Sequence, residues 1–235
     1  MSDFLSFDTL SLHAGQTLDS EYGSRAQPIH QTTSYVFTDT DTASSLFNLE
    51  RGGHVYNRIS NPTVGALEQR VAALEGGSAS VCVASGMSAV FCALTALVSQ
   101  GDHVVASANM YGGNISLLKN TLPRFGITAT FVDPTDIKEI ESAIQENTKI
   151  IFGELIGNPG LSVMDIEAVS KICSKHHLPL MIDGTFNTPY LCRCFEYGAN
   201  IIVHSLTKWM GGHGTSIGGV VVAVSYTHLT LPTKA

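Results

Sequence analysis

The chain has 235 residues, of which 44% are hydrophobic and 14% are charged, and 13 Lys and Arg against 20 Asp and Glu give a formal net charge of −7. This apolar share is too high for a disordered chain, and the acidic balance argues against a nucleic-acid binder, which normally carries a concentrated basic excess. The charged share lies well below the ~25% typical of globular domains, which predicts surface hidden in a subunit interface and hence an oligomer.

The start of the chain predicts a cytoplasmic protein. No basic residue precedes Arg25, so the positive region of a secretion signal or transit peptide is absent. The longest apolar run, Ala89 to Val98, is shorter than the ~18 residues of a membrane helix. The five cysteines form no Cys-x-x-Cys pair, and most lie in apolar runs where free thiols pack as small hydrophobic groups. We therefore expect a reducing compartment and no membrane contact.

Residues 1–60 are polar, rich in turns and weakly periodic. Gly23, Pro28 and the pair Gly52-Gly53 interrupt any long element. We interpret this stretch as an extended arm that makes subunit contacts, which would also use apolar surface that the low charged share leaves unexplained.

From residue 61 helical periodicity alternates with short β-branched runs. Asn61-Pro62 provides a helix cap and a first-turn proline, and Gly76-Gly77 ends that helix. The alternation predicts an α/β domain over 61–224, with a mainly parallel sheet flanked by helices. The expected strands lie near 79–84, 103–108, 127–132, 149–155, 179–183, 200–204 and 217–224, and the expected further helices begin at Ser85 or span 113–122, 136–146 and 165–177.

The last residues, 225–235, differ from what precedes them. They continue neither the strand at 217–224 nor a recognisable helix. We interpret them as an artefactual tail that is foreign to the domain, which is typical of a truncated gene rather than a natural terminus.

Polar residues follow several predicted strands, at the edge where an open parallel sheet binds its ligands. Ser85-Gly86-Met87 stands at a helix start, where free backbone amides and the helix dipole attract an anion such as phosphate. Asp183 ends the strand at 179–183, and Ser205-Leu206-Thr207-Lys208 follows the strand at 200–204. The three segments are predicted to meet in one site.

An anion-binding helix start, a carboxylate and a lysine are the groups with which an enzyme holds pyridoxal phosphate. The lysine amine forms a Schiff base with the aldehyde, and the carboxylate keeps the pyridine nitrogen protonated. Taken singly, Asp183 is more typical of a cap, Ser85-Gly86 of a turn and Lys208 of a solvated side chain. Because all three lie at strand ends, the interpretation as a cofactor site is favoured over these separate structural roles.

Competing catalytic motifs lack their partners. Ser205-x-x-Lys208 matches the active-site motif of penicillin-binding proteins, but neither Ser-Asp-Asn nor Lys-Thr-Gly occurs in the chain. No Gly-x-Ser-x-Gly motif surrounds Ser85, since position 83 is Val, and the P-loop and His-Glu-x-x-His motifs do not occur in the sequence. None of the nine His has partners at metal-ligand spacing, so we expect no metal site and structural roles for His204 and His176-His177.

Five segments carry a family resemblance, namely Gln31-Thr-Thr-Ser-Tyr-Val-Phe37, Tyr56-Asn-Arg58-Ile-Ser-Asn-Pro-Thr63, Ala84-Ser-Gly-Met87, Leu122-Pro-Arg-Phe-Gly126 and Val203-His-Ser-Leu-Thr-Lys-Trp-Met-Gly-Gly-His-Gly214. The last segment is highly specific. From about Leu10 to Val224 the chain resembles the transsulfuration (Cys/Met metabolism) family of enzymes that depend on pyridoxal 5′-phosphate, and most closely its O-acetylhomoserine sulfhydrylase (aminocarboxypropyltransferase) branch.

The resemblance implies the large domain of the aspartate aminotransferase-like fold type I. It implies that Lys208 is the Schiff-base lysine and that Asp183 pairs with the pyridine nitrogen. Tyr111 would stack on the ring and assist proton or leaving-group chemistry, and Asn158 would lie near the ring. The residues implied to surround the phosphate are Ser85, Gly86, Met87, Ser205 and Thr207.

The family also shares its active sites between subunits. By resemblance, Tyr56 and Arg58 reach the phosphate of the adjacent subunit's cofactor, within a homotetramer. The implied reaction is γ-replacement on O-acetylhomoserine by sulfide or methanethiol, giving homocysteine or methionine. A cystathionine γ-synthase, a methionine or cystathionine γ-lyase, and an inactive fragment that only associates with intact subunits remain as alternatives.

The sequence also departs from the usual family pattern. Gly184 stands where Asn is usual, Leu155 where a small hydroxyl residue is frequent, and Cys194 where Pro is common, which we expect to loosen the ring pocket. The family's C-terminal small domain, which supplies the arginine for the substrate carboxylate, does not follow residue 224. We therefore expect the full-length gene to encode the enzyme and this chain to be its N-terminal part.

Overall fold

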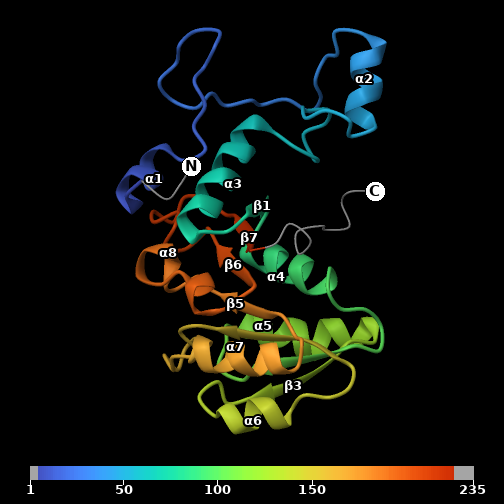
Figure 1. Cartoon of the computed structure of the whole chain (residues 1–235), viewed down its shortest axis with the longest axis vertical. Helices are drawn as coiled ribbons and strands as arrows, with labels where there is room; N and C mark the ends of the chain where they lie inside the picture. Colours follow the sequence, from blue (N-terminus) through green and yellow to red (C-terminus); the bar gives the residue numbers. More distant parts are fainter. Residues whose placement is uncertain (1–4, 225–235) are drawn as a thin grey trace.

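A seven-stranded sheet organises residues 5–224, the part of the chain that the computed structural model describes (Figure 1). The strand order is β1-β7-β6-β5-β4-β2-β3, and β7 runs antiparallel to both of its neighbours while the other pairs are parallel. The prediction of a mainly parallel α/β sheet is thus confirmed. The strands are β1 (Ala79–Val83), β2 (His103–Ser107), β3 (Thr128–Val132), β4 (Thr148–Glu154), β5 (Leu180–Asp183), β6 (Ile201–Ser205) and β7 (Gly219–Ala223).

The direction of β7 follows from the connection that precedes it. A parallel neighbour would need a crossover over one face of the sheet, usually through a helix. Residues 206–218 contain no helix, and the chain turns back so that Ser205 pairs with Gly219 and Ile201 with Ala223. The sequence pattern predicted this strand but contained no signal for its reversal.

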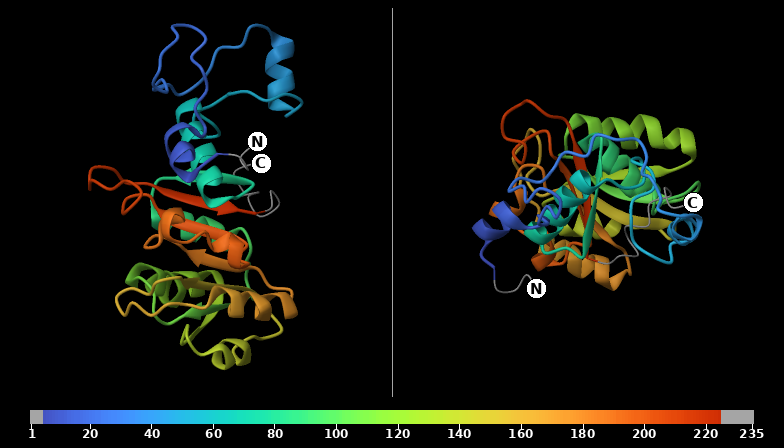
Figure 2. Two further views of the ribbon diagram at one scale, coloured as in Figure 1. Left: turned by 60° about the vertical axis from the view of Figure 1, so that its left-hand side comes forward. Right: turned by 90° about the horizontal axis from the view of Figure 1, so that it is seen from above.

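Helices lie on both sides of the sheet (Figures 1 and 2). None of those in residues 5–224 is long and apolar enough to cross a membrane. The α-helices are α1 (Phe7–His13), α2 (Thr40–Phe47), α3 (Pro62–Glu75), α4 (Gly86–Thr95), α5 (Gly112–Ser116), α6 (Ile137–Ser142), α7 (Ile166–Lys175) and α8 (Thr188–Leu191), accompanied by a π-helix (Leu117–Thr121) and two 3-10 helices (Leu122–Phe125 and Cys194–Tyr197).

The alternation of side chains along the strands divides the core into two layers. Met181 and Val203 pack with Leu94 of α4 on one face, whereas Ile182 and Ile202 pack with α7 on the other. All of these strand side chains are almost fully buried. Because both faces are covered, the central strands read as continuous apolar runs, which is why their positions could be predicted.

Two predicted helices differ from those observed. The helix expected over 113–122 is α-helical only to Ser116 and continues as the π-helix and a 3-10 helix up to Phe125. Pro123 lacks the N–H that would continue an α-helical ladder. The helix expected over 136–146 begins as predicted, with Asp136 as its cap, but ends at Ser142.

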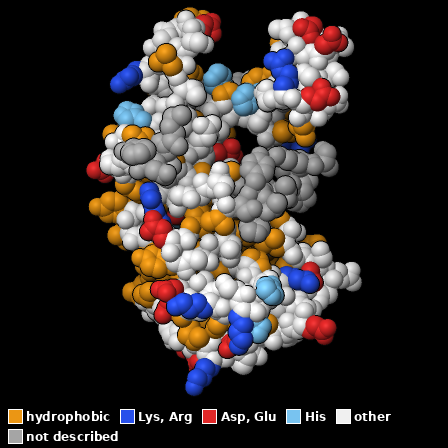
Figure 3. Space-filling model, in the orientation of Figure 1, with side chains coloured by type: hydrophobic (Ala, Val, Ile, Leu, Met, Phe, Trp, Pro, Cys, Tyr) orange, Lys and Arg blue, Asp and Glu red, His pale blue; other side chains and the backbone are white. Residues whose placement is uncertain are grey.

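The N-terminal segment, residues 5–60, contains two short helices that the sequence analysis did not anticipate. Ser6 caps α1 and Asp39 caps α2 through side-chain bonds to backbone N–H groups. Much of this segment lies above the sheet in Figure 1 and forms the upper part of the surface in Figure 3, and it exposes large apolar side chains. The most exposed of these are Leu18, Tyr22, Ile29 and Val36.

The two-layer core generates a testable expectation about stability. Ile202→Val, a change inside a fully buried strand, should lower the free energy of unfolding by about 1 kcal/mol, because it removes one methylene and leaves a small void. Urea denaturation measures the loss. The matched control Ile217→Val, at a side chain that is 77% exposed, should change it by less than about 0.5 kcal/mol. Equal losses would contradict the assigned burial.

Candidate active site

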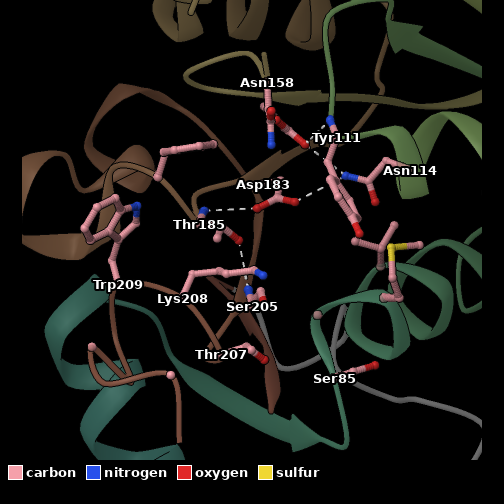
Figure 4. A pocket seen from close by; sticks show the side chains of 17 residues that line it. Ser85, Tyr111, Asn114, Asn158, Asp183, Thr185, Ser205, Thr207, Lys208 and Trp209 are labelled. Carbon is pink, nitrogen blue, oxygen red and sulfur yellow. Dashed lines mark hydrogen bonds between the residues drawn. The ribbon is translucent and has the colours of Figure 1, made fainter. Parts of the chain in front are cut away.

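A cavity of about 540 Å³ lies at the carboxyl ends of β4, β5 and β6, beside the start of α4 (Figure 4). Its volume is typical of small-molecule sites. The predicted site residues that line it are Ser85, Gly86, Met87, Tyr111, Asn158, Asp183, Ser205, Thr207 and Lys208. The structure therefore brings together nine of the eleven residues that the sequence analysis selected.

Tyr56 and Arg58 lie elsewhere, in the N-terminal segment, and do not line this cavity. The Arg58 guanidinium carbon lies 5.8 Å from the centre of the exposed Tyr56 ring, within cation–π range. The two side chains thus form a pair of their own.

The start of α4 is held tightly against neighbouring strands. Ser85 caps the helix, its Oγ accepting a hydrogen bond of 3.1 Å from the Ser88 N–H. A Cβ on Gly86 would come within 2.6 Å of Ser205 Cβ, and one on Gly219 within 2.0 Å of the Ser85 carbonyl oxygen. Only glycine permits this approach, which brings the backbone amides of the helix start to the edge of the cavity.

Asp183 is fixed at the end of β5 by donors on both sides. Its Oδ1 accepts from the Thr185 N–H at 3.0 Å, and its Oδ2 accepts from Asn114 Nδ2 at 3.3 Å. Thr185 Oγ1 in turn accepts from the Ser205 N–H at 2.9 Å, which ties the ends of β5 and β6 together. The carboxylate is therefore presented to the cavity in one orientation.

Glu154 is a second carboxylate at this edge, and the sequence analysis did not select it. It ends β4, is paired in register with Asp183, and is 5% exposed. Its Oε1 accepts from the Tyr111 N–H at 2.7 Å and from Asn114 Nδ2 at 3.1 Å. Burial, followed by the negative charge of Asp183, raises the pKa of Glu154 to about 7, although the hydrogen bonds that it accepts act in the opposite direction.

Lys208 belongs to the connection between β6 and β7. Its backbone N–H donates to the Ser205 carbonyl at 3.2 Å. Beside it, the Thr207 hydroxyl donates to the Gly218 carbonyl at 3.3 Å and accepts from the Gly218 N–H at 3.1 Å. These two bonds form a clasp between Thr207 and Gly218 that closes the base of the connection.

Sequence reasoning missed several residues of the lining. Glu154 carried a usable signal, because it ends an apolar strand as Asp183 does. Asn114 had none, since only the three-dimensional start of α5 brings it to the two carboxylates. The lining residues that the sequence analysis did not select as site residues are Val90, Asn114, Glu154, Thr185, Phe186, Trp209, Gly212 and Gly214.

The three departures from the family pattern do not line the cavity. Leu155 and Cys194 are buried in the core layer that packs on α7. A Cβ on Gly184 would lie 2.7 Å from Cε1 of His204, whose ring forms a fully buried pair with Glu75. The space beside Gly184 is therefore filled by His204, and the expected loosening of the pocket stays a prediction.

The environment of Glu154 predicts how stability depends on pH. A carboxyl pKa raised from 4.5 to about 7 by folding means that the folded chain holds a proton that the unfolded chain has released. Stability is then lost as the pH rises from about 4.5 to about 7. Glu154→Gln should remove this loss, so that the variant is more stable than the original chain at pH 8, by up to roughly 3 kcal/mol, and loses that advantage near pH 5.

Urea unfolding followed across this pH range measures the effect. The matched control is Glu146→Gln, at an exposed carboxylate outside the cavity, which should leave the pH profile unchanged. Parallel profiles for the Glu154→Gln chain and the original chain would show that Glu154 does not bind the extra proton.

Comparisons with known proteins agree on one family. The model of the family described as Cys/Met metabolism PLP-dependent enzyme, where PLP is pyridoxal 5′-phosphate, matches residues 8–234. A homocysteine synthase from Schizosaccharomyces pombe is 49% identical over 217 residues, which are 92% of this chain and 51% of that protein. An O-acetyl-L-homoserine sulfhydrylase from Leptospira meyeri is 49% identical over 215 residues, 92% of this chain and 49% of that protein. The chain spans about half the length of these curated relatives.

The comparison with a solved structure shows that the fold is similar as well. The crystal structure of a Campylobacter jejuni protein assigned as an O-acetylhomoserine (thiol)-lyase is similar with a TM-score of 0.91 and 41% identity, covering 95% of this chain and 55% of that one. That protein carries N′-pyridoxyl-lysine-5′-monophosphate. The predicted fold type I architecture and the predicted cofactor of the family are thereby confirmed. The chain belongs to the family of Cys/Met metabolism PLP-dependent enzymes.

Proposed function

We propose that this chain forms the cofactor-binding part of an enzyme that replaces the acetate of O-acetylhomoserine with sulfide or methanethiol, giving homocysteine or methionine. The observation that carries the proposal is one cavity lined by a strand-end carboxylate, Asp183, a lysine, Lys208, and the helix start at Ser85. The names of the two relatives, homocysteine synthase and O-acetyl-L-homoserine sulfhydrylase, support the substrate class.

Both the polar and the apolar residues of the cavity lining fit pyridoxal phosphate. Two buried oxygens at the cavity, Asn114 Oδ1 and Glu154 Oε2, have no hydrogen-bond partner within residues 5–224. Unpartnered buried polar groups are costly and favour a ligand that brings hydrogen-bond partners. Phe186 and Trp209 supply apolar wall, as a flat aromatic ring requires.

The residues of the chain would have separate roles in binding the cofactor and in the reaction. When bound, the cofactor supplies an electron sink that stabilises negative charge on the substrate's Cα. Lys208 would hold the aldehyde carbon through its amine and, once displaced by the substrate's amino group, move protons between Cα and Cβ. Asp183 would accept the N–H of the pyridine ring. The residues proposed to bind the phosphate are Ser85, Gly86, Met87, Ser205 and Thr207.

Two further side chains are assigned to the ring. The Tyr111 side chain lines the cavity and is half exposed, as stacking on a ligand and access to a departing group require. Its backbone N–H is held by Glu154, which limits the movement of its loop. Asn158 lines the same cavity and is assigned a place near the ring.

The N-terminal segment is proposed to act in trans. Tyr56 and Arg58 would reach the phosphate of an adjacent subunit's cofactor, so that the active site is shared within a homotetramer. The exposed apolar side chains of residues 5–60 support a role in subunit contacts. We also propose a cytoplasmic location, which the five free cysteines support.

Two alternatives remain open within this framework. A cystathionine γ-synthase or a methionine or cystathionine γ-lyase would use the same cofactor site on a different substrate. An inactive fragment would associate with intact subunits through residues 1–60 without chemistry of its own. The two experiments that follow separate these possibilities.

The first experiment locates the lysine that holds the cofactor. Borohydride reduction of the protein mixed with pyridoxal phosphate, followed by peptide mapping, should place the label on Lys208, because Lys208 is the only lysine that lines the cavity within the described residues. Lys208→Arg should abolish the label, whereas Lys171→Arg, at an exposed lysine on α7, should retain it. A label spread over surface lysines, with no visible absorbance band, would favour the inactive fragment.

The second experiment identifies the reaction. The full-length enzyme is incubated with O-acetylhomoserine and sulfide. Product analysis should show homocysteine and acetate in equal amounts, because γ-replacement couples loss of one group to addition of the other. Methionine and cystathionine, offered separately, should be broken down more slowly. Faster breakdown of cystathionine than conversion of O-acetylhomoserine would overturn the sulfhydrylase assignment in favour of a lyase.

A further inference from the structure

Two carboxylates share one hydrogen-bond donor at the edge of the cavity. Glu154 and Asp183 are register partners at the ends of the parallel strands β4 and β5, so their side chains leave the sheet on the same face. The amide nitrogen of Asn114, itself 1% exposed, donates to Glu154 Oε1 at 3.1 Å and to Asp183 Oδ2 at 3.3 Å (Figure 4 draws the bond to Asp183). Asn114 therefore bridges the two groups.

Two negative charges in this place would repel each other with little compensation. Within residues 5–224 neither carboxylate forms an ion pair. The groups that face Glu154 are Asn114 from α5, the backbone N–H and side chain of Tyr111, Asn158 from the 155–160 segment, and Asp183 from β5. Lys208, from the β6–β7 connection, is the only basic side chain that lines the cavity in this part of the chain. The surroundings therefore favour one negative charge over two.

The donors are not divided equally between the two carboxylates. Both oxygens of Asp183 accept hydrogen bonds, one from Thr185 and one from Asn114. Only one oxygen of Glu154 does so, and its buried Oε2 has no partner. A buried ionised carboxylate needs donors on both oxygens, whereas in a neutral acid the oxygen that carries the proton no longer requires a donor. The geometry thus suits a charged Asp183 beside a protonated Glu154, and the raised pKa of Glu154 agrees with this division.

We propose that Asn114 and Glu154 are positioning residues that act on the cofactor ring through Asp183, and that the arrival of a cationic ring at Asp183 expels the proton from Glu154. Asn114 holds both carboxylates at a fixed separation, so the charge on one is felt by the other. A protonated pyridine ring neutralises Asp183 and relieves the repulsion on Glu154. The O–H bond of Glu154 then breaks, its electron pair stays on the oxygen, and the proton passes to the solvent. This inference rests on the proposed function only in placing the ring at Asp183.

Calorimetric titration tests the inference without measuring turnover. Pyridoxal phosphate is titrated into the full chain near pH 6.5 in buffers of different ionisation enthalpy, and the slope of the binding enthalpy gives the protons released. The original chain should release up to about one proton more than the Glu154→Gln chain, because protonation changes on the cofactor itself are common to both. The difference should vanish near pH 9, where Glu154 has already lost its proton. Glu146→Gln, at an exposed position, should behave like the original chain.

The affinity provides a second readout. Because the ionised form of Glu154 favours the cationic ring, the cofactor should bind more tightly to the original chain as the pH rises towards about 7, by up to about tenfold per pH unit. In Glu154→Gln this contribution should be absent. Asn114→Leu, which keeps the volume but removes both N–H donors, should weaken binding about tenfold or more, since a hydrogen bond to a charged group is lost.

The outcomes separate the two proposals. Cofactor attached to Lys208 with equal proton release in the original and Glu154→Gln chains would overturn this inference and leave the proposed function intact. Failure of the original chain to take the cofactor on Lys208 would overturn the proposed function and this inference with it. A Glu154→Gln chain that does not fold would also contradict the inference, because glutamine imitates the neutral acid that we assign to the cofactor-free protein.

Discussion

The register between β4 and β5 is the constraint on which the candidate site depends. It places the buried Glu154 opposite the half-buried Asp183 at neighbouring strand ends, so that two carboxylates lie together at the cavity. The Tyr111 amide, Asn114 and Thr185 each donate a hydrogen bond to one or both of these carboxylates. The site is therefore a set of donors arranged around a pair of acids.

The alternation of side chains along the strands, which builds the core, also determines the face of the sheet on which the two carboxylates lie. Phe152 and Met181 are register partners that pack in the layer of α4, and two residues further along each strand come Glu154 and Asp183 on that same face. The apolar side chains of this layer and the two carboxylates therefore lie on the same face of the sheet. Burial of the strands holds the carboxylates rigidly, and the cost of burying their charge is limited where one of them keeps its proton.

The sequence was informative where a physical rule links residue type to position. Strands buried on both faces appear as apolar runs, so the sheet could be predicted, and the rule that ligands bind beyond strand ends selected Asp183 and Lys208. Asn114 could not be found in this way, because its role depends on how the start of α5 meets two other strands. The reversal of β7 was hidden for a similar reason, since direction depends on the path of residues 206–218. The roles of Tyr56 and Arg58 in a neighbouring subunit stay a prediction.

The clasp between Thr207 and Gly218 closes the base of the β6–β7 connection, and Lys208 lies within the loop that it closes. Within that loop the Gly211 N–H donates to the Leu206 carbonyl at 2.9 Å and the Gly212 N–H donates to the Lys208 carbonyl at 2.8 Å, while residues 213–217 are exposed beyond these bonds. Changes in the length or composition of residues 213–217 can be absorbed with little displacement of the lysine, because Gly212 on one side of that stretch and Gly218 on the other are held by hydrogen bonds. An engineer who wishes to graft a new recognition loop beside the cavity would find the natural insertion point there.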